Sequence, residues 1–228
     1  MSDPNLPLLE RAASKLVPLL DEVVFVGGVA LGLLINDAAA APIRGTNDVD
    51  VIAEIITYVD YIAFSERLRH EHFKEDSGEQ PLTCRWHYEE LTLDVLPLSE
   101  DVLGYTNMWH EGSLRNARTI ALPSGKLIKV VSAPFFLGTK MEAFRGRGNK
   151  DFLASHDLED FVAVVDGRHH IVQEISDSPS ELQQYLIHAA TELLNAPLFL
   201  DVLPGYVLDE GRVPLIIERL TAISTLNS

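Results

Sequence analysis

Residues 25–51, FVGGVALGLLINDAAAAPIRGTNDVDV, contain the pattern that decides the fold. A short β-rich run ends in Gly27 and Gly28, and the apolar residues after it are numerous enough for a buried helix. The stretch closes with Asp48 and Asp50 in a second strand-like run, although aspartate is a poor strand former. The stretch therefore predicts a strand, a tight turn, a helix and a strand, with two acids that need an explanation.

Strand geometry places these acids together. Alternate residues of a strand share one face, so Asp48 and Asp50 are expected side by side while Val49 and Val51 face the core. A third acid, Asp94, lies among apolar residues in LTLDVLPL, where an unpartnered carboxylate is costly. If the two strands are neighbours, the three carboxylates converge and destabilise the fold unless a cation lies between them. Magnesium, or manganese in its place, prefers such oxygen ligands.

Each acid also has an ordinary structural explanation. Asp48 fits a turn, Asp50 fits a solvent-facing strand position, and Asp94 fits a partner of an arginine. The glycine pair favours a site, because glycine lets backbone amides approach an anion and a helix N-terminus attracts phosphate. Two other phosphate-binding motifs are disfavoured, because the chain lacks the G-x-G-x-x-G spacing here and no Gly-Lys-Ser or Gly-Lys-Thr follows.

The rest of the chain predicts the overall class. Strands concentrate in residues 1–131 and helices in residues 132–228, and no linker sequence marks the boundary. We therefore expect an α+β protein, with a mixed-sheet core flanked by helices over the first range and a helical C-terminal region over the second. The expected elements, besides those above, are helices at 6–20, 58–72, 155–165, 180–195 and after Pro214, a strand around Asp94, and a hairpin at 118–132 that turns at Pro123, Ser124 and Gly125.

Composition narrows the class of protein. The chain has 228 residues, of which 46% are hydrophobic and 23% charged, and no apolar run approaches the roughly 20 residues of a membrane helix. Its acidic, proline-containing start does not resemble a secretory signal, so we expect a cytoplasmic protein without a membrane partner. The single cysteine, Cys84, cannot form an internal disulfide and has no second thiolate nearby for zinc.

The charge balance bears on nucleic acid. A formal net charge of -16 argues against broad, sequence-independent adhesion to nucleic acid, which depends on neutralising phosphates. One local cluster of four cations is an exception, because Glu142 is the only acid near them before Asp151. Either a solvated helix end and loop or a phosphate-facing edge explains it. Its members are Lys140, Arg145, Arg147 and Lys150.

Taken together, these residues resemble a known family. The glycine pair that opens a helix, the run from Arg44 to Asp50 and the isolated strand acid Asp94 look like the nucleotidyltransferase core of the DNA polymerase β superfamily. More loosely, GGVAL, the acidic strand, KMEA at 140–143 and DLED at 157–160 are similar to the four motifs of AbiEii-type nucleotidyltransferases, a group that includes bacterial toxins. The resemblance covers residues 25 to about 166.

The resemblance implies transfer of a nucleotidyl group from an NTP to an acceptor hydroxyl, with release of pyrophosphate. Asp48 and Asp50 would hold the metal ions in a two-metal arrangement. Asp94 would complete the second metal site and would accept the hydroxyl proton.

The remaining roles implied by the resemblance concern the nucleotide. Gly27 and Gly28 would cradle the triphosphate, and Thr46 would lie in the same nucleotide-binding segment. Arg44 and Lys140 would neutralise charge that develops on the phosphates. These positions complete the expected nucleotide-binding set.

Asp157 and Asp160 lie three residues apart on one helix face, so they would orient Lys140 or the base. An ordinary explanation is available here too. Asp157 in a first helical turn stabilises the helix dipole whatever the function, and Lys140 fits a surface position.

Several alternatives stay open. The acceptor is RNA, a protein or a small molecule, and an antitoxin partner is possible if the chain is a toxin. A fold that only binds nucleotide or a partner protein, without catalysis, is a second possibility. An HD-type phosphohydrolase, suggested by His156 beside Asp157 and by His70 and His72, is disfavoured because that fold is all-helical and the first half of this chain is rich in strands.

Overall fold

The computed structural model describes residues 3–78, 82–146 and 150–226, and it divides into two compact units. The sheet unit consists of the described residues of Ser2–Gly32 and Arg44–Ser132. The helical unit consists of the described residues of Leu33–Ile43 and Ala133–Ser228. The predicted division into domains after residue 131 stays a prediction, and the grouping of residues 33–43 with the C-terminal helices is a feature that the sequence does not indicate.

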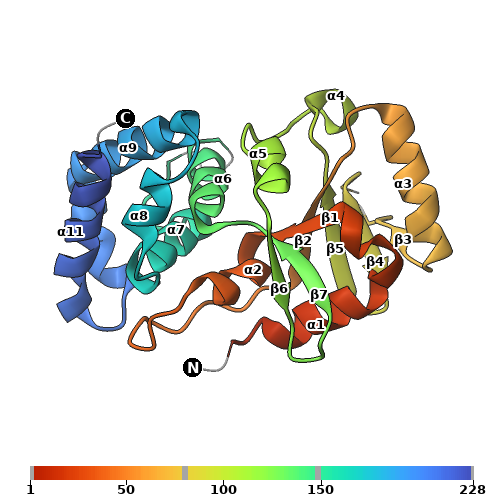
Figure 1. Ribbon diagram of the computed structural model, residues 1–228, viewed down its shortest axis with the longest axis horizontal. Helices are drawn as coiled ribbons and strands as arrows, with labels where there is room; N and C mark the ends of the chain where they lie inside the picture. The colour runs from red at the N-terminus through yellow and green to blue at the C-terminus, as the bar shows by residue number, and fades with distance from the viewer. Residues whose placement is uncertain (1–2, 79–81, 147–149, 227–228) are drawn as a thin grey trace. The chain divides into compact units, whose positions relative to one another are not determined.

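The sheet unit alternates strands with short helices (Figure 1). Helix α2 begins in this unit, and its last two residues belong to the other. The elements are α1 (Leu6–Lys15), a 3₁₀ helix η1 (Val17–Glu22), β1 (Val23–Val26), α2 (Gly27–Leu34), β2 (Asp48–Ala53), α3 (Tyr58–His70), β3 (Lys74–Glu75), β4 (Arg85–Tyr88), β5 (Leu91–Leu96), α4 (Glu100–Leu103), α5 (His110–Arg115), β6 (Arg118–Ala121) and β7 (Leu127–Val130).

The strands form one mixed sheet of seven strands in the order β3-β4-β5-β2-β1-β7-β6. β2 runs antiparallel to β1 and parallel to β5, and β5 runs antiparallel to β4. Helix α1 packs against β2 and β5, and α5 packs against β1 and β2. All four residues of β1 are buried, and Val49 and Val51 of β2 are buried as the alternation predicts. The predicted mixed-sheet α+β class is confirmed.

The helical unit contains the C-terminal helices, as predicted. Ser155 caps α7, because its hydroxyl accepts a hydrogen bond from the Leu158 amide at 3.3 Å. The elements are α6 (Ala133–Arg145), α7 (His156–Gly167), α8 (Ile171–Ser176), α9 (Ser180–Leu194), α10 (Pro197–Val202), η2 (Leu203–Tyr206), η3 (Glu210–Arg212) and α11 (Val213–Ser224).

Two predicted helices differ in extent. The helix expected over residues 6–20 ends at Lys15, because Pro18 has no amide to donate and disfavours the α conformation at Val17. Helix α7 includes Gly167 instead of ending before it. A Cβ at Gly167 would lie 2.7 Å from a methyl carbon of Ile35, so the glycine serves close packing.

In the described ranges, no single helix is long and apolar enough to cross a membrane. Only α9 taken together with the segment Pro197–Tyr206 meets the length and hydropathy requirements, and that pair is bent by 77°.

Candidate functional site

The three predicted acids lie on neighbouring strands of the sheet unit. β2 pairs with β5 in parallel register, with Asp50 opposite Asp94 and Asp48 opposite Thr92. Asp48 and Asp50 therefore share one face of β2, and Asp94 shares that face from the adjacent strand. The expectation that the two strands are neighbours is confirmed.

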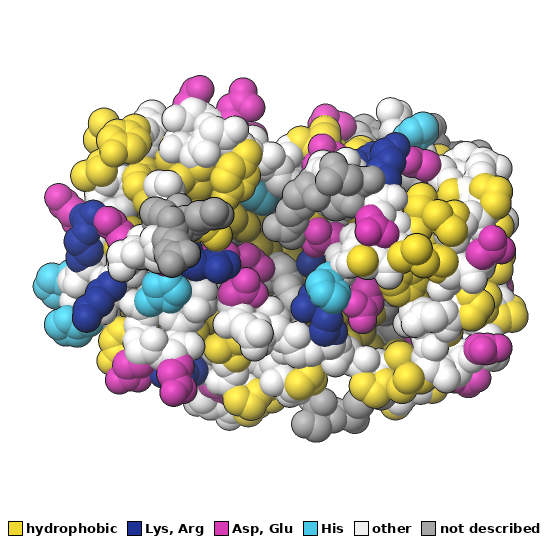
Figure 2. All heavy atoms as spheres, turned by 180° about the vertical axis from the view of Figure 1, so that it is seen from behind, with side chains coloured by type: hydrophobic (Ala, Val, Ile, Leu, Met, Phe, Trp, Pro, Cys, Tyr) yellow, Lys and Arg dark blue, Asp and Glu magenta, His cyan; other side chains and the backbone are white. Residues whose placement is uncertain are grey.

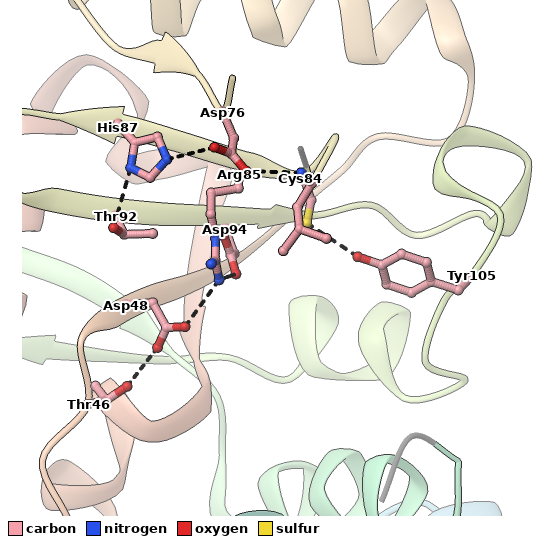
Figure 3. A network of polar contacts seen from close by, with 10 residues as sticks. Thr46, Asp48, Asp76, Cys84, Arg85, His87, Thr92, Asp94 and Tyr105 are labelled. Carbon is pink, nitrogen blue, oxygen red and sulfur yellow. Dashed lines mark hydrogen bonds and ion pairs between the residues drawn. The ribbon is translucent and has the colours of Figure 1, made fainter. Parts of the chain in front are cut away.

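Arg85, at the start of β4, lies directly against this acidic group. Its Nε donates to Asp94 Oδ1 at 2.8 Å and its Nη2 donates to Asp94 Oδ2 at 2.7 Å, a two-bond contact (Figure 3). Nη2 also lies 3.4 Å from Asp48 Oδ2. The hydrogen bonds to Asp94 are the main cause of the raised pKa of Arg85, so this guanidinium stays charged.

Asp48 has a second contact on its other oxygen. The hydroxyl of Thr46 donates to Asp48 Oδ1 at 2.7 Å, which fixes the carboxylate at the start of β2. Thr46 also lies close to Gly28, where an added Cβ would be 3.3 Å from the Thr46 Cβ. Thr46 therefore bridges the predicted glycine pair and the first acid.

Gly27 has a backbone that suits glycine alone. Its φ is +63°, and a Cβ built there would lie 1.9 Å from Asp50 Oδ2. No L side chain fits this position while the Asp50 carboxylate remains where it is. The glycine and the aspartate, far apart in sequence, thus occupy one small space at the junction of β1 and α2.

Asn5 was not predicted and holds these segments together. Its Nδ2 donates to the carbonyls of Gly28 and Arg44, each at 3.1 Å, and its Oδ1 accepts from the Thr46 amide at 2.9 Å. The residue is only 1% exposed. Its position before α1 signals a helix cap, yet its side chain makes no cap bond and binds the loop before β2 instead.

A second polar pair next to the same sheet face, His87 with Asp76, was not predicted from the sequence. His87 of β4 lies with Nε2 3.3 Å from Asp76 Oδ1 and with Nδ1 3.4 Å from the Thr92 hydroxyl (Figure 3). Hydrogen bonds from the backbone amides of Leu82 and Gly78 are the main cause of the lowered pKa of Asp76.

The remaining predicted residues, Lys140 and Asp157, belong to the helical unit. Lys140 Nζ lies 3.1 Å from Asp157 Oδ1 and 2.7 Å from Asp160 Oδ2, between α6 and α7. The side chain of Lys140 is 8% exposed, so the surface position considered for it is wrong. Asp157 and Asp160 contact Lys140 as predicted, and a role of these residues toward a nucleotide stays a prediction.

The three predicted acids differ in how they could bind a divalent cation. Asp48 and Asp50 offer adjacent carboxylate oxygens, which suit magnesium. Asp94 is engaged on both oxygens by Arg85, and across residues 3–78, 82–146 and 150–226 no group of three or more His, Cys, Asp or Glu is arranged to hold a metal ion. Oδ1 of Asp48 accepts from Thr46 and Oδ2 lies 3.4 Å from Arg85, so a metal site on Asp48, Asp50 and Asp94 stays a prediction.

Known proteins give a limited match. No protein-family model matches the chain, and no curated protein matches it. JHP933 from Helicobacter pylori has a similar structure, with a TM-score of 0.51 at 13% identity over 98% of this chain and 93% of that one. The similarity is one of fold.

Two further solved structures are similar at lower scores. A putative nucleotidyltransferase from H. pylori has a TM-score of 0.48 at 11% identity, over 98% of this chain and 96% of that one. An antigenic nucleotidyltransferase-like protein from Paracoccidioides brasiliensis has a TM-score of 0.46 at 19% identity, over 72% of this chain and 76% of that one.

The predicted basic cluster is largely paired with acids. Arg145 Nη2 lies 2.6 Å and Lys150 Nζ 2.9 Å from the carboxylate of Glu192, while Arg147 lies outside the described residues. On the face that Figure 2 shows, the described Lys and Arg side chains lie beside Asp and Glu side chains and do not form one broad basic area. This pairing differs from the open positive charge that a phosphate backbone requires.

Proposed function

We propose that the chain is a magnesium-dependent nucleotidyltransferase that moves an NMP group from an NTP to an acceptor hydroxyl and releases pyrophosphate. The observation that carries the proposal is the joint placement of Asp48 and Asp50 on one strand face, with Gly27 kept free of a side chain beside Asp50. Neighbouring carboxylates on one strand face repel each other, and a bound cation would offset that repulsion.

The chain's own residues would prepare the site in defined ways. Asp48 and Asp50 would hold the magnesium ion, which when bound neutralises phosphate charge and polarises the reacting phosphorus. Thr46 would keep Asp48 in place by its hydrogen bond, and Asn5 would hold the loop before β2 against the start of α2. Backbone amides at Gly27 and Gly28 would face the triphosphate.

The roles of Arg44, Lys140 and Asp157 toward the nucleotide remain predictions from the family resemblance. A catalytic function for Lys140 requires that the pairs with Asp157 and Asp160 open or that the three side chains act together. A cytoplasmic location is likewise part of the proposal.

We propose that the acceptor is not a nucleic acid, so that it has no phosphodiester backbone. Arg145 and Lys150, two of the four cations that a phosphate-facing edge would use, both lie on the carboxylate of Glu192. A small molecule or a protein hydroxyl needs no extended basic surface. The proposal therefore ranks these acceptors above RNA.

A toxin-like function follows only from the looser similarity to AbiEii-type proteins. If it holds, expression of the wild type arrests bacterial growth, an Asp48→Asn/Asp50→Asn variant does not, and an antitoxin partner restores growth. Growth arrest that persists in the double variant would separate toxicity from nucleotidyl transfer.

The transfer reaction is tested with α-labelled NTPs and magnesium, against a pool of cellular RNA, protein and small metabolites. We expect label to move to one acceptor class with the wild type and with Asp101→Asn, an exposed acid of α4 that serves as the matched control. Asp48→Asn and Asp50→Asn should each lower the rate by at least about 100-fold, since both would hold the metal. Full activity of either variant contradicts the proposal.

One observation favours a second function, binding of nucleotide without transfer. Both oxygens of Asp94 accept hydrogen bonds from Arg85, so in this arrangement Asp94 is not open to a metal ion or to a hydroxyl proton. Metal-dependent NTP binding without any transfer of label would support this second function.

A further inference from the structure

A threonine, a histidine and an aspartate form a chain of polar contacts beside the predicted acids of the sheet. We propose that Thr92 is an acceptor hydroxyl of the proposed reaction, so that the protein transfers a nucleotidyl group to its own Thr92 with His87 as the base. The inference deepens the proposed function and rests on it, because the NTP is the donor in both. It names the acceptor as a protein hydroxyl within the same chain.

The strand register places Thr92 between the acids and the histidine. Thr92 of β5 is the partner of Asp48 in β2 on one side and of His87 in β4 on the other. Such partners share one face of the sheet, and neighbouring strands lie about 4.8 Å apart. The hydroxyl of Thr92, a residue of intermediate exposure, therefore lies on the face that carries Asp48 and Asp50.

The contacts of His87 fit the role of a base. The Thr92 hydroxyl lies 3.4 Å from His87 Nδ1, and His87 Nε2 lies 3.3 Å from Asp76 Oδ1 (Figure 3). Amides of Leu82 and Gly78 donate to Asp76 and lower its pKa, so Asp76 is a carboxylate that accepts from the protonated Nε2. Nδ1 is then the unprotonated nitrogen and faces the hydroxyl. A hydroxyl, a histidine and an acid follow one another in the same order as in hydrolytic triads.

Both contacts of the imidazole are longer than the about 2.6–3.2 Å of a catalytic hydrogen bond, and such contacts commonly shorten when substrate binds. The other predicted base is less well placed, because Arg85 donates to both oxygens of Asp94. The side chain of His87 is 39% exposed and that of Asp94 is 11% exposed. His87 is thus the more accessible proton acceptor on this face.

The order of the strands suits an in-line displacement. β2 lies between β5, which carries Thr92, and β1, which leads into Gly27. With the triphosphate at Gly27 and Gly28, as proposed, the leaving pyrophosphate lies on the β1 side of β2 and the attacking hydroxyl on the β5 side. The attacking and leaving oxygens must lie on opposite sides of the reacting phosphorus.

The step balances with the groups named. Oγ1 of Thr92 forms a bond to the α-phosphorus of the NTP, and the bond from that phosphorus to the oxygen that bridges to the β-phosphate breaks. Pyrophosphate leaves with the electron pair of the broken bond, and the hydroxyl proton passes to His87 Nδ1. Asp76 is a positioning residue, because it orients the imidazole and stabilises the positive ring that forms.

The inference is tested by incubating the purified protein with magnesium and an α-labelled NTP, without any other acceptor. We expect label on the protein, and mass spectrometry of the digested protein should locate one NMP group on Thr92. Thr92→Val should abolish this label and Thr92→Ser should keep it, because serine retains the hydroxyl. His87→Gln should lower the labelling rate by at least about 100-fold. The matched control is Thr119→Val, at an exposed position of β6, which should be labelled at the wild-type rate.

A separate measurement tests Asp76. In Asp76→Asn we expect a lower labelling rate at saturating NTP, with no change in the NTP concentration that gives half the maximal rate. A labelling rate equal to that of the wild type, or a rise in that concentration, would overturn the positioning role of Asp76.

The outcomes separate this inference from the proposed function. Label on the cellular acceptor pool but not on the protein, or an NMP group on another residue, would overturn the inference and leave nucleotidyl transfer intact. A rate per chain that falls on dilution would overturn transfer within one chain. No label on either the protein or the pool would contradict the proposed function as well. Circular dichroism establishes whether Thr92→Val folds, and if it does not, the site located in the wild type decides.

Discussion

Gly27 is the residue at which backbone conformation and the candidate site meet most closely. Its left-handed φ of +63° and the 1.9 Å approach of an added Cβ to Asp50 Oδ2 both exclude a side chain. We predict that Gly27→Ala lowers the free energy of unfolding by more than the about 1 to 2 kcal/mol expected for a left-handed backbone alone. Chemical denaturation measures the loss.

The matched control for that prediction is Gly125→Ala. Gly125 also has a positive φ, +84°, and an added Cβ there meets nothing within 4 Å, so only the backbone cost remains. Replacing Asp50 by alanine should recover most of the excess cost of Gly27→Ala, because Oδ2 and Cγ are removed while the Cβ at 3.1 Å stays. Equal costs at the two glycines would show that Asp50 does not occupy the space beside Gly27.

His110 makes stability depend on pH. Burial lowers its pKa to about 4 from the usual 6.5, while the ring contacts the Pro97 carbonyl at 3.1 Å. Between pH 6.5 and about 4, His110 is therefore protonated in the unfolded chain and neutral in the folded chain. The free energy of unfolding falls as the pH drops through this range. The loss over this window is about 3 kcal/mol. In His110→Asn this part of the pH dependence should vanish, as urea unfolding at pH 7 and pH 4.5 would reveal.

The sequence predicts some of these positions and misses others for a physical reason. Asp48, Asp50 and the glycine pair stand out because their residue types disagree with a plain strand or helix. Arg85 does not stand out, since the hairpin that brings it to Asp94 turns at Glu89 and Glu90, without glycine, asparagine or proline. Glu89 adopts φ of +51° there, which is uncommon for a residue of its type.

Among the elements, the loop before β2 and the start of α2 depend on one side chain from the N-terminal segment. Asn5 bonds the buried Gly28 carbonyl, the part-buried Arg44 carbonyl and the Thr46 amide, and Asn5→Ala removes all three bonds. We predict a loss of about 2 to 4 kcal/mol in the free energy of unfolding. Asn116→Ala, which removes a bond from an exposed side chain to the Gly112 carbonyl, is the control and should cost well under half as much.

Helices α6 and α7 are joined by a buried ion group. Lys140 lies against Asp157 and Asp160, and Asp160 is fully buried. We predict that Lys140→Met destabilises the chain by about 3 to 5 kcal/mol, because two carboxylates lose their counter-charge. Lys150→Met removes a half-exposed charge of the same unit and should cost about 1 kcal/mol or less.

A further variant tests the cause of that loss. Changing Asp157 and Asp160 to asparagine in the Lys140→Met background removes the uncompensated charge and should restore part of the stability. No recovery in thermal or urea unfolding would mean that the uncompensated carboxylates are not the cause, and would favour the loss of the lysine ammonium, which lies 5.6 Å from the centre of the Phe136 ring.

Over the whole chain, the distribution of charge bears on the acceptor. The net charge is -16, and Arg145 and Lys150 both pair with Glu192. We predict that Arg145→Gln/Lys150→Gln changes RNA binding less than twofold at 150 mM salt in a filter-binding assay. A marked loss of affinity, with a shallower dependence on salt, would show that these residues contact phosphates.

The sequence predicts the fold class of the whole molecule, but it does not predict the order of all the strands. Apolar runs and helical patterns predict β1, β2, β5 and the main helices, because those segments bury apolar faces. The β6–β7 hairpin is predicted by its turn residues Pro123, Ser124 and Gly125, since β6 itself is mostly exposed. Strand β3 has only two residues and the short helices have too few for a periodic pattern, whereas β4 is as long as β1 but buries only Trp86 of its four residues. The joining of residues 33–43 to the helical unit depends on contacts distant in sequence, such as Arg212 with Asp37 at 2.8 Å.

The most direct test of the central claim compares two labels in one reaction. Wild-type protein is incubated with magnesium, the acceptor pool and an NTP labelled at either the α- or the γ-phosphorus. A nucleotidyltransferase should move the α label to the acceptor and release the γ label as pyrophosphate, with both events lost in Asp48→Asn/Asp50→Asn. Transfer of the γ label to the acceptor, or transfer that persists in the double variant, would contradict the claim that Asp48 and Asp50 serve nucleotidyl transfer.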